Sequence, residues 1–521
     1  MEEYKVLITT GGIGSRLGDL TTYKNKALVR VGKKAAISHI VESYPENIEM
    51  VVTVDYHGEL VKDFLQLVYP KRKFTFIDTK GSPSVGCSIL MAKEELQCPF
   101  IFHACDTIIK DQQNIPTPYC NWIGGHISSN SSHYRSFNVS NDRVLKMNEK
   151  GEKDYDYIHI GLCGFKDYEL FWSILEKLYG GNKTNKELSD CHVISEMLEE
   201  TLVKYIEFST WFDIGNIDGL RIAKEVIEED INVIEKQAEE IYMTESSVIK
   251  FFYDKDIVDK RVKRTKLLNG LVPKVTGVKG NFYKYDFIEG EELSKKITVD
   301  ILKDLISWMS NNLWHQLGDS TEETFDRFYN FYFVKTRNRM LEFLSNNNIK
   351  DTPVVINGIK CSSVAVLLDK IDLQLLCSEV PYRFHGDFIL DNIIYTLDEE
   401  FCLIDWRQDF EGVLDYGDVY YDLAKLNHSF IFNHELINKG YFSINIDSEI
   451  QFELFEKYTL SICQKAFYST IKELGFNCNK VAIITSLIWL NMAALHPRPI
   501  NLFLWYFGQY NLTLALQGSL I

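Results

Sequence analysis

The chain has 521 residues, of which 45% are hydrophobic and 25% charged, and its formal net charge is −17 at pH 7. This length exceeds what one hydrophobic core usually supports, so we expect two or three domains. The negative charge argues against a nucleic-acid-binding scaffold, because binding a phosphate backbone needs a basic face. Small phosphate substrates remain compatible with it, because a few local cations can hold them.

The 11 cysteines include no C-x-x-C pair, which is typical of reduced thiols and therefore favours a cytoplasmic protein. The first residues, MEEYKVLITT, are acidic and run straight into a β-rich segment, unlike a signal peptide. An apolar stretch at residues 481–495 contains Asn491 and stops at a His-Pro pair. It is too short to span a bilayer, so we expect a buried helix and no membrane insertion.

In the first half, short β-rich runs alternate with helical patterns. The runs occupy residues 4–9, 49–54, 74–77 and 100–104. This alternation is typical of an α/β domain with a mostly parallel sheet flanked by helices. The apolar spacing of residues 220–241 predicts a helix with an acidic outer face. We place the domain boundary there, with a first domain at residues 1–235 and a second at residues 236–521.

A glycine-rich turn follows the first β-rich run. Glycines let backbone N–H groups approach a triphosphate closely, and nearby polar and cationic side chains add donors and charge. The turn has neither the Gly-Lys-Ser/Thr of a Walker A loop nor the third glycine of a dinucleotide fingerprint. The candidate phosphate-binding residues are Gly11, Gly12, Gly14, Ser15, Arg16 and Lys26.

Residues 11–44, GGIGSRLGDLTTYKNKALVRVGKKAAISHIVESY, resemble the start of the sugar-nucleotidyltransferase family. These enzymes condense a nucleoside triphosphate with a phosphate monoester and release pyrophosphate. Asn25 and Ala35 replace two prolines of the family pattern. The resemblance implies a nucleotidyltransferase-like α/β fold in which Arg16 and Lys26 are catalytic and the loop residues bind the nucleotide.

Three later positions fit the same resemblance. Gly86, within residues 81–88, matches the family's glycine turn against the nucleotide base, and Asp106 and Asp213 match its two metal-binding aspartates. Two carboxylates can hold Mg²⁺ or Mn²⁺ against the reacting phosphates and so reduce the repulsion between two anions. Taken alone, an aspartate after a strand is often only a turn former.

Two weaker candidates lie between these aspartates. Glu149 and Lys150 resemble the family's pair near the acceptor phosphate, although such a pair is also common on solvated surfaces. His159 either faces the acceptor or is a satisfied core histidine, and the sequence leaves both interpretations open.

The second half begins with β-rich residues 247–253 and 281–288 and then becomes largely helical, which predicts an α+β domain. Residues 384–395, FHGDFILDNIIY, precede FCLIDW at 401–406. Phosphoryl transfer from ATP to an alcohol needs a carboxylate that orients and deprotonates the hydroxyl, and an Asn and an Asp that hold Mg²⁺. Asp387, Asn392 and Asp405 have these types in this order.

This string resembles the aminoglycoside-phosphotransferase and choline-kinase family, as does GDVYYDLA at residues 417–424. The resemblance implies a protein-kinase-like fold in which Asp387 is catalytic and Asn392 and Asp405 bind the metal. Lys250 would contact the ATP phosphates, and residues 282–290 would hold the adenine. We identify neither a glutamate partner for Lys250 nor a glycine-rich loop before it.

A kinase makes a phosphate monoester and a nucleotidyltransferase consumes one, so the fusion predicts consecutive reactions. A small alcohol would be phosphorylated by ATP and then linked to a nucleotide, as a precursor for capsule or lipopolysaccharide decoration. The pairing of choline kinase with CTP:phosphocholine cytidylyltransferase suggests CTP, by analogy alone.

The acceptor stays open among choline-like compounds, amino alcohols, polyols and sugars. A quaternary ammonium would need an aromatic cage, and a late cluster could form either a cage or a core: Trp489, Trp505, Tyr506, Phe507 and Tyr510. Arg498 either touches the acceptor or caps a loop. The competing interpretations are a sugar 1-kinase fused to a sugar-1-phosphate nucleotidyltransferase, a regulatory protein built from degenerate enzyme domains, and antibiotic phosphorylation by the second domain alone.

Overall fold

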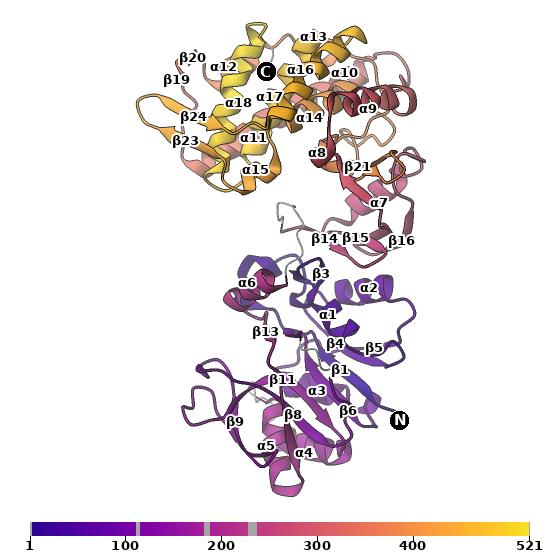
Figure 1. Ribbon diagram of the computed structural model, residues 1–521, viewed down its shortest axis with the longest axis vertical. Coiled ribbons are helices and arrows are strands. Elements are labelled where there is room, and N and C mark those ends of the chain that lie inside the picture. Colours follow the sequence, from indigo (N-terminus) through magenta and orange to yellow (C-terminus); the bar gives the residue numbers. More distant parts are fainter. Residues whose placement is uncertain (1–2, 111–114, 182–187, 228–236, 520–521) are drawn as a thin grey trace. The chain divides into compact units, whose positions relative to one another are not determined.

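The computed structural model describes residues 3–110, 115–181, 188–227 and 237–519. Its contacts divide the chain into two compact units (Figure 1). The first comprises Met1–Lys255 and Thr276–Phe287, and the second comprises Asp256–Val275 and Ile288–Ile521. This division differs from the boundary at residues 235/236 that the sequence suggested.

A nine-stranded sheet in the order β5-β4-β1-β6-β11-β8-β12-β10-β9 forms the centre of the first unit. The first four strands of this order are parallel, as expected, but β11 runs antiparallel to β6 and opens a mixed half. A mostly parallel sheet is therefore correct only for the half that carries the glycine loop. The strands are β1 (Lys5–Thr9), β4 (Met50–Val54), β5 (Phe74–Asp78), β6 (Phe100–Ala104), β8 (Asn121–His126), β9 (Ser136–Ser140), β10 (Arg143–Asn148), β11 (Tyr157–Phe165) and β12 (Val203–Glu207).

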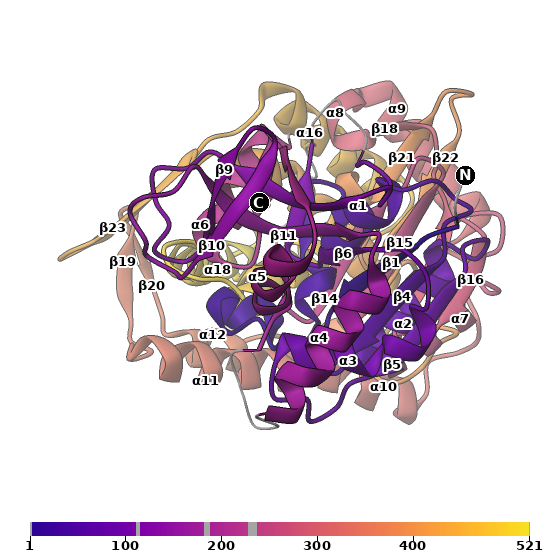
Figure 2. The same cartoon turned by 90° about the horizontal axis from the view of Figure 1, so that it is seen from below.

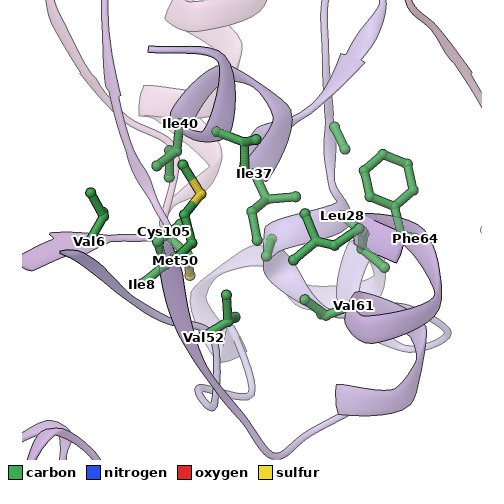
Figure 3. Packing of buried hydrophobic residues seen from close by; sticks show 14 of the residues in the cluster. Val6, Ile8, Leu28, Ile37, Ile40, Met50, Val52, Val61, Phe64 and Cys105 are labelled. Atoms are coloured by element: carbon green, nitrogen blue, oxygen red, sulfur yellow. The ribbon is translucent and has the colours of Figure 1, made fainter. Parts of the chain in front are cut away.

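Helices cover both faces of this sheet. The alternation of β1 divides its side chains, so that Val6 and Ile8 join the hydrophobic cluster of Ile37, whereas Leu7 joins a second cluster with Phe171. Figure 3 shows Val6 and Ile8 in the first cluster, with Ile37 among its members. Burying one such side chain stabilises the fold by about 1.5–3 kcal/mol. The helices are α1 (Ala36–Glu42), α2 (Gly58–Val68), α3 (Val85–Met91), α4 (Tyr168–Gly181), α5 (Asp190–Glu200) and α6 (Ile217–Val226); α4 and α5 pack side by side (Figures 1 and 2).

Two short ribbons complete the part of the first unit that carries the site. They pair β2 (Arg30–Val31) with β3 (Lys34–Ala35), and β7 (Thr107–Ile109) with β13 (Trp211–Asp213). The second ribbon matters for the site, because it joins the segment after β6 to a segment about a hundred residues later.

A four-stranded sheet, β14-β15-β17-β16, also packs within the first unit. The Tyr242 hydroxyl donates a hydrogen bond of 2.7 Å to the Leu28 carbonyl, and the Phe64 ring meets both Tyr242 and Phe282. The helix expected over residues 220–241 is wrong at its end, because α6 stops at Val226 and Ile241 lies in β14. Residues 228–236 of that range lie outside the described residues. The strands are β14 (Glu239–Met243), β15 (Ser247–Phe252), β16 (Val275–Lys279) and β17 (Phe282–Asp286).

The second unit is largely helical, as expected. Its principal helices are α7 (Lys255–Arg264), α9 (Val299–Asn312), α10 (Glu322–Tyr329), α11 (Lys335–Asn347), α14 (Val419–Ile431), α16 (Tyr458–Glu473), α17 (Cys478–Ala493) and α18 (Ile500–Leu516). Shorter helices are α8 (Leu293–Lys296), α12 (Val364–Asp369), α13 (Leu373–Cys377) and α15 (His434–Asn438), with a π-helical turn at Asn330–Val334. The buried α17 confirms the helix expected at residues 481–495. Within the described ranges, no helix is long and apolar enough to cross a membrane.

Two small sheets accompany these helices. One has the order β18-β21-β22, formed by β18 (Gly290–Glu292), β21 (Ile393–Thr396) and β22 (Phe401–Leu403). The other has the order β20-β19-β24-β23, formed by β19 (Val354–Ile356), β20 (Ile359–Cys361), β23 (Phe442–Ile446) and β24 (Ile450–Leu454). The β21–β22 hairpin matters most, because it separates the two ends of the second candidate site.

Candidate functional site

The glycine-rich loop follows β1 directly and lies against Lys26. Gly14 has φ +72°, and a Cβ there would lie 3.0 Å from Thr21 Cγ2 and 3.1 Å from Lys26 Cβ, so this turn requires glycine. A Cβ on Gly12 would lie 3.6 Å from Lys26 Nζ. Of the predicted nucleotide-binding residues, Gly12 and Gly14 thus lie against the Lys26 side chain, whereas Gly11 lies beside Thr79 and Asp55. Ser15 begins the 3-10 turn Ser15–Thr21 that follows. Nucleotide binding by this loop stays a prediction.

Lys26 and Asp106 form an ion pair at the end of β6. The Lys26 Nζ lies 2.8 Å from Asp106 Oδ2. Burial would raise the pKa of Asp106, but the Lys26 ammonium outweighs it and lowers that pKa below its usual value. The same carboxylate raises the pKa of Lys26, although burial alone would lower it. Both groups are therefore charged at neutral pH.

Asp213 is brought to the same place by the β7–β13 ribbon, in which it pairs with Thr107, the neighbour of Asp106. A Cβ on Gly215 would lie 2.7 Å from Asp106 Oδ2, 2.9 Å from Asp213 Oδ1 and 3.0 Å from Arg16 Nη2. The two carboxylates and one guanidinium therefore converge on the backbone of Gly215, which has no room for a side chain.

Hydrogen bonds fix the Asp213 carboxylate. Its Oδ2 accepts bonds of 2.8 Å from the Tyr134 hydroxyl and from Asn216 Nδ2, and its Oδ1 accepts one of 2.8 Å from the Gly215 N–H. Sequence reasoning missed Tyr134, because nothing in the local pattern indicates that it reaches a residue 79 positions away. A fixed carboxylate needs little reorganisation when it binds a cation.

These groups line a pocket of about 500 Å³. Its lining residues are Arg16, Ala104, Asp106, Thr107, Ser132, His133, Tyr134, Lys150, His159, Ile160, Gly161, Trp211 and Asp213. The pocket thus contains five predicted residues, with Lys150 and His159 among them. Glu149, by contrast, pairs with Arg135 at 2.9 Å.

The donor set of this pocket fits Mg²⁺ or Mn²⁺. Both ions prefer oxygen ligands, and carboxylates are the usual protein ligands of Mg²⁺ in phosphate-transfer sites. Asp106 and Asp213 supply two carboxylates at one point, and Arg16 lies beside them. This arrangement can neutralise a polyphosphate and hold it against a second phosphate.

His159 faces this pocket from β11. The strand register shifts between His159 and Cys163, and Gly161 within this bulge has φ +74° and would clash with Ala104 if it carried a Cβ. His159 Nε2 lies 2.8 Å from Asp190 Oδ2, while its Nδ1 is buried with no hydrogen-bond partner. The contact with Asp190 fits the interpretation as a core histidine. Contact of His159 with the acceptor stays a prediction.

Gly86 lies in the first turn of α3, close to Leu188. A Cβ there would lie 2.6 Å from Leu188 Cγ, and its N–H already donates to the Leu188 carbonyl at 2.8 Å. Packing against Leu188 is enough to explain this glycine. Contact of Gly86 with a nucleotide base stays a prediction.

Asp387 and Asn392 meet in the second unit, in the loop before β21. Asn392 Nδ2 donates to the Asp387 carbonyl at 2.8 Å and to its Oδ2 at 3.2 Å. The five-residue spacing thus folds the loop into a closed turn. Lys425 Nζ, from α14, lies 2.7 Å from Asp387 Oδ1. Sequence reasoning missed this ion pair.

Asp422 holds the backbone of the same loop. Its carboxylate accepts bonds of 2.8 Å from the His385 N–H and 2.7 Å from the Gly386 N–H, and a third of 3.2 Å from Trp314 Nε1. Gly386 has φ +90°, and a Cβ there would lie 2.6 Å from Arg407 Cβ. The GDVYYDLA segment therefore positions the loop that carries Asp387.

Asp405 follows β22 in a strained conformation. Its φ is +58°, which is rare for a residue other than glycine. The neighbouring Ile404 N–H donates to the Asn392 carbonyl at 2.9 Å, and the Ile404 carbonyl contacts the His385 ring at 3.0 Å. Hydrogen bonds therefore tie the segment that carries Asp405 to the loop of Asp387 and Asn392. Backbone strain of this kind concentrates at functional sites.

Lys250 is buried in β15, a strand of the first unit, opposite Tyr283 of β17. Its predicted role at the ATP phosphates is not tested by the geometry of either unit. In the late aromatic cluster, Trp489 and Trp505 are fully buried, with Trp489 against Phe507 at 4.5 Å and Trp505 stacked on Phe343 at 4.6 Å. These rings are core, whereas Tyr510 is only partly buried.

Arg498 contacts the end of α11. Its Nε lies 3.3 Å from Asn347 Oδ1, and its Nη2 lies 3.3 Å from the Asn347 carbonyl. Of the two interpretations left open by the sequence, this contact fits the cap.

Comparison with known proteins yields matches that cover less than half of the chain. No protein-family model matches the sequence. The bifunctional protein GlmU of Methanococcus vannielii is 24% identical over 219 residues, which are 40% of this chain and 51% of that protein. GlmU of Methanocaldococcus jannaschii is 24% identical over 248 residues, 47% of this chain and 59% of that protein. The chain spans about half the length of the curated relatives it matches.

Solved structures match a similar share. A putative glucose-1-phosphate thymidylyltransferase from Bacillus anthracis is 20% identical with a TM-score of 0.38, over 45% of this chain and 98% of that one. CTP:phosphocholine cytidylyltransferase from Streptococcus pneumoniae is 20% identical with a TM-score of 0.37, over 43% of this chain and all of that one. The matches to the curated relatives support a nucleotidyltransferase-like first domain. The kinase-like second domain stays a prediction.

Proposed function

We propose that the chain is a bifunctional enzyme that phosphorylates a small alcohol with ATP and then transfers a nucleotidyl group to the phosphomonoester. The observation that carries this proposal is the convergence of Asp106, Asp213 and Arg16 on Gly215, beside the Lys26 ion pair. Such a constellation suits the meeting of two phosphate groups, and it lies next to the glycine loop.

In the nucleotidyl transfer, an oxygen of the phosphomonoester attacks the α-phosphorus of the triphosphate. A new P–O bond forms, the bond between the α-phosphorus and its bridging oxygen breaks, and pyrophosphate leaves. Arg16 and Lys26 would neutralise charge on the triphosphate, and Asp106 and Asp213 would hold the divalent cation. That cation, when bound, lowers the repulsion between the two anions.

In the phosphorylation, Asp387 accepts the proton of the substrate hydroxyl. The hydroxyl oxygen bonds to the γ-phosphorus of ATP, the bond between the γ-phosphorus and its bridging oxygen breaks, and ADP leaves. The bond from Asn392 Nδ2 orients the Asp387 carboxylate, and the Lys425 ammonium compensates its negative charge. Asn392 and Asp405 would hold the divalent cation of ATP.

The second nucleotide is CTP in this proposal, and the product is an NDP-linked precursor for surface polysaccharide. A sugar 1-kinase fused to a sugar-1-phosphate nucleotidyltransferase is the alternative for the same residues. A regulatory pseudoenzyme is less compatible, because the Lys26–Asp106 and Asp387–Asn392 contacts are formed.

Product analysis by mass spectrometry tests the proposal. The protein is incubated with ATP, Mg²⁺ and CTP, GTP or UTP, and with choline, ethanolamine, glycerol, ribitol or hexoses. A nucleotide-linked product of one alcohol is the expected result. Consumption of ATP without such a product would contradict the second step, and an absence of any product would contradict both steps.

A further inference from the structure

A buried cluster of three metal-ligating side chains lies in the first unit, beside the pocket that His159 lines. His159 and Cys163 belong to β11, and Asp190 is the first residue of α5. All three residues are buried. Imidazole nitrogen, thiolate sulfur and carboxylate oxygen are the ligand atoms of protein zinc sites. The cluster therefore has the composition of a zinc site.

The distances between these ligand atoms are close to those of a tetrahedral zinc site. Cys163 Sγ lies 3.9 Å from His159 Nε2 and 3.8 Å from Asp190 Oδ2, and Nε2 lies 2.8 Å from Oδ2. With zinc–ligand bonds of about 2.0–2.3 Å, the ligand atoms of such a site are about 3.3–3.8 Å apart. Widening the contact between Nε2 and Oδ2 by about 0.5 Å would therefore admit the ion.

The backbone of β11 brings His159 and Cys163 together. In a regular strand, Cα atoms four residues apart are about 13 Å from each other, which separates their side chains. In β11 the register shifts between His159 and Cys163, so that four steps along β11 match two steps along β8. Gly161, within this bulge, has φ +74°. A bulge re-aims side chains, and this one aims a nitrogen and a sulfur of one strand at the same point.

The surroundings of Asp190 favour a cation. Cys163 and Cys191 belong to the hydrophobic cluster of Phe171, so the carboxylate lies at the edge of an apolar core. A buried charge is costly unless an opposite charge compensates it. Within the described ranges, the ion pair of Asp190 is the one with His159. Cys191 Sγ lies 3.9 Å from Asp190 Oδ2, which makes a second sulfur available to an ion at this point.

We propose that His159 Nε2, Cys163 Sγ and Asp190 Oδ2 bind Zn²⁺, with Cys191 Sγ as the fourth ligand. Thiolate and imidazole ligands select zinc over Mg²⁺, which prefers oxygen. Bonds form from the ion to these four atoms, and the two thiol protons and the proton between His159 and Asp190 pass to solvent. The ion joins β11 to the start of α5 and stabilises the first unit. This site is separate from the carboxylate pair of the proposed function.

Bound zinc and zinc affinity test the proposal on the full chain. The protein is loaded with Zn²⁺ in excess Mg²⁺, dialysed against metal-free buffer, and its zinc is measured by mass spectrometry. Affinity is measured by competition with a chromophoric chelator. Cys163→Ser and Asp190→Asn each remove one ligand, and Cys463→Ser, at a buried cysteine of α16, is the matched control. Asp106→Asn examines whether zinc binds at the pocket carboxylates instead.

The inference expects one zinc ion per wild-type chain. Loss of even an outer-shell partner costs about 10- to 100-fold in metal affinity, so Cys163→Ser and Asp190→Asn should weaken zinc binding by at least about 100-fold. Cys463→Ser and Asp106→Asn should keep the wild-type affinity. If Cys163→Ser does not fold, Asp190→Asn decides, because asparagine keeps the size of the side chain. Zinc should also raise the Tm of the wild-type protein, because binding to the folded state stabilises it.

Cobalt substitution identifies the sulfur ligands. Cobalt-loaded wild-type protein should have a thiolate-to-cobalt charge-transfer absorption that weakens in Cys163→Ser and in Cys191→Ser. An unchanged absorption in Cys191→Ser would overturn the assignment of the fourth ligand. A wild-type protein without bound zinc, or equal affinity in wild type and folded Asp190→Asn, would overturn the site. Zinc that is lost in Asp106→Asn and kept in Cys163→Ser would place the ion at the pocket carboxylates and would also overturn it.

Discussion

Lys26 Nζ lies 2.8 Å from Asp106 Oδ2, across 80 residues of sequence. The contact joins Lys26, which lies against the glycine loop after β1, to Asp106, the second residue after the end of β6. The strands β1 and β6 are parallel neighbours in the sheet. Ligand sites of open α/β sheets form at the carboxyl ends of the strands. The ion pair thus marks the edge of the sheet where the pocket lies.

Asp106→Asn should stop nucleotidyl transfer and leave phosphorylation intact. The amide keeps the shape of the side chain but removes the charge that pairs with Lys26 and would bind the cation, so we expect a loss of about 100-fold or more. The measurement is pyrophosphate release from CTP with a supplied phosphomonoester, with ATP consumption assayed in parallel.

Asp142→Asn is the matched control for this variant. Asp142 lies in the turn between β9 and β10 with φ +65°, a conformation that asparagine also adopts. It should retain both activities. If folded Asp106→Asn lost both activities, the hypothesis that nucleotidyl transfer and phosphorylation take place at two separate sites would be refuted.

Asp387→Asn should have the opposite effect to Asp106→Asn, stopping phosphorylation and leaving nucleotidyl transfer intact. Without the carboxylate that accepts the hydroxyl proton, phosphorylation should fall about 100- to 10,000-fold, whereas nucleotidyl transfer to a supplied phosphomonoester should continue. Asp398→Asn, in the exposed turn between β21 and β22, serves as the control. ADP formation at saturating alcohol measures the effect. A variant with wild-type ADP formation would remove Asp387 from the mechanism.

Gly215→Ala tests the close approach of the three charged groups. The added Cβ would meet Asp106 Oδ2 at 2.7 Å and Asp213 Oδ1 at 2.9 Å, so it should displace the carboxylates. A displacement on the scale of 1 Å can cost about 100-fold in rate, and we expect a loss of 10- to 100-fold in nucleotidyl transfer. Pyrophosphate release and the Mg²⁺ concentration for half-maximal rate are measured.

Gly180→Ala provides the comparison for that variant. Gly180 lies in α4 with open space at its Cβ position. Alanine there should be neutral or stabilise the helix by up to about 1 kcal/mol. Equal activity of Gly215→Ala and Gly180→Ala would show that the carboxylates do not need this approach.

Local patterns sufficed for the parallel strands, the glycine loop and the HGD-x-x-x-x-N turn. β-Rich runs and fixed spacings are properties of short segments, so they can be recognised without knowledge of the tertiary structure. The prediction was wrong at the end of the helix expected over residues 220–241, because tertiary contacts decide the structure there. Tyr242 packs on Phe64 and bonds to Leu28, and these tertiary contacts favour a strand over the local helical pattern.

The supporting residues of both sites were beyond the reach of the sequence. Tyr134 reaches Asp213, Asp190 reaches His159, and Lys425 reaches Asp387. Each pair joins segments that only the folded sheet or helix bundle brings together. Tyrosine, aspartate and lysine are also common on surfaces, so none of these residues carries a local signal.

Asp422 should make the stability of the second unit depend on pH. Burial raises the pKa of its carboxyl to about 6, although the N–H groups of His385 and Gly386 and the neighbouring Trp314 lower it. In the unfolded chain this carboxyl has a pKa of about 4. Between roughly pH 4 and pH 6 the folded state therefore binds more protons than the unfolded state, and the free energy of unfolding should fall as pH rises through this range. The difference of about two pKa units corresponds to a loss of roughly 3 kcal/mol, complete above pH 6.

Urea unfolding followed by tryptophan fluorescence at pH 4.5, 5.5 and 7 measures this slope. Asp422→Asn cannot titrate, so its contribution to the slope should disappear. It should also lose phosphorylation, because His385 and Gly386 donate to different oxygens of Asp422 and the amide nitrogen that replaces one of them cannot accept an N–H. Asp369→Asn, on the surface beside Arg337, should keep the wild-type slope and activity. A slope that is the same in Asp422→Asn and wild type would mean that another group titrates. The geometry makes Asp422 the anchor of His385 and Gly386. Full phosphorylation activity in Asp422→Asn would therefore contradict this role and show that the Asp387 loop does not depend on the carboxylate.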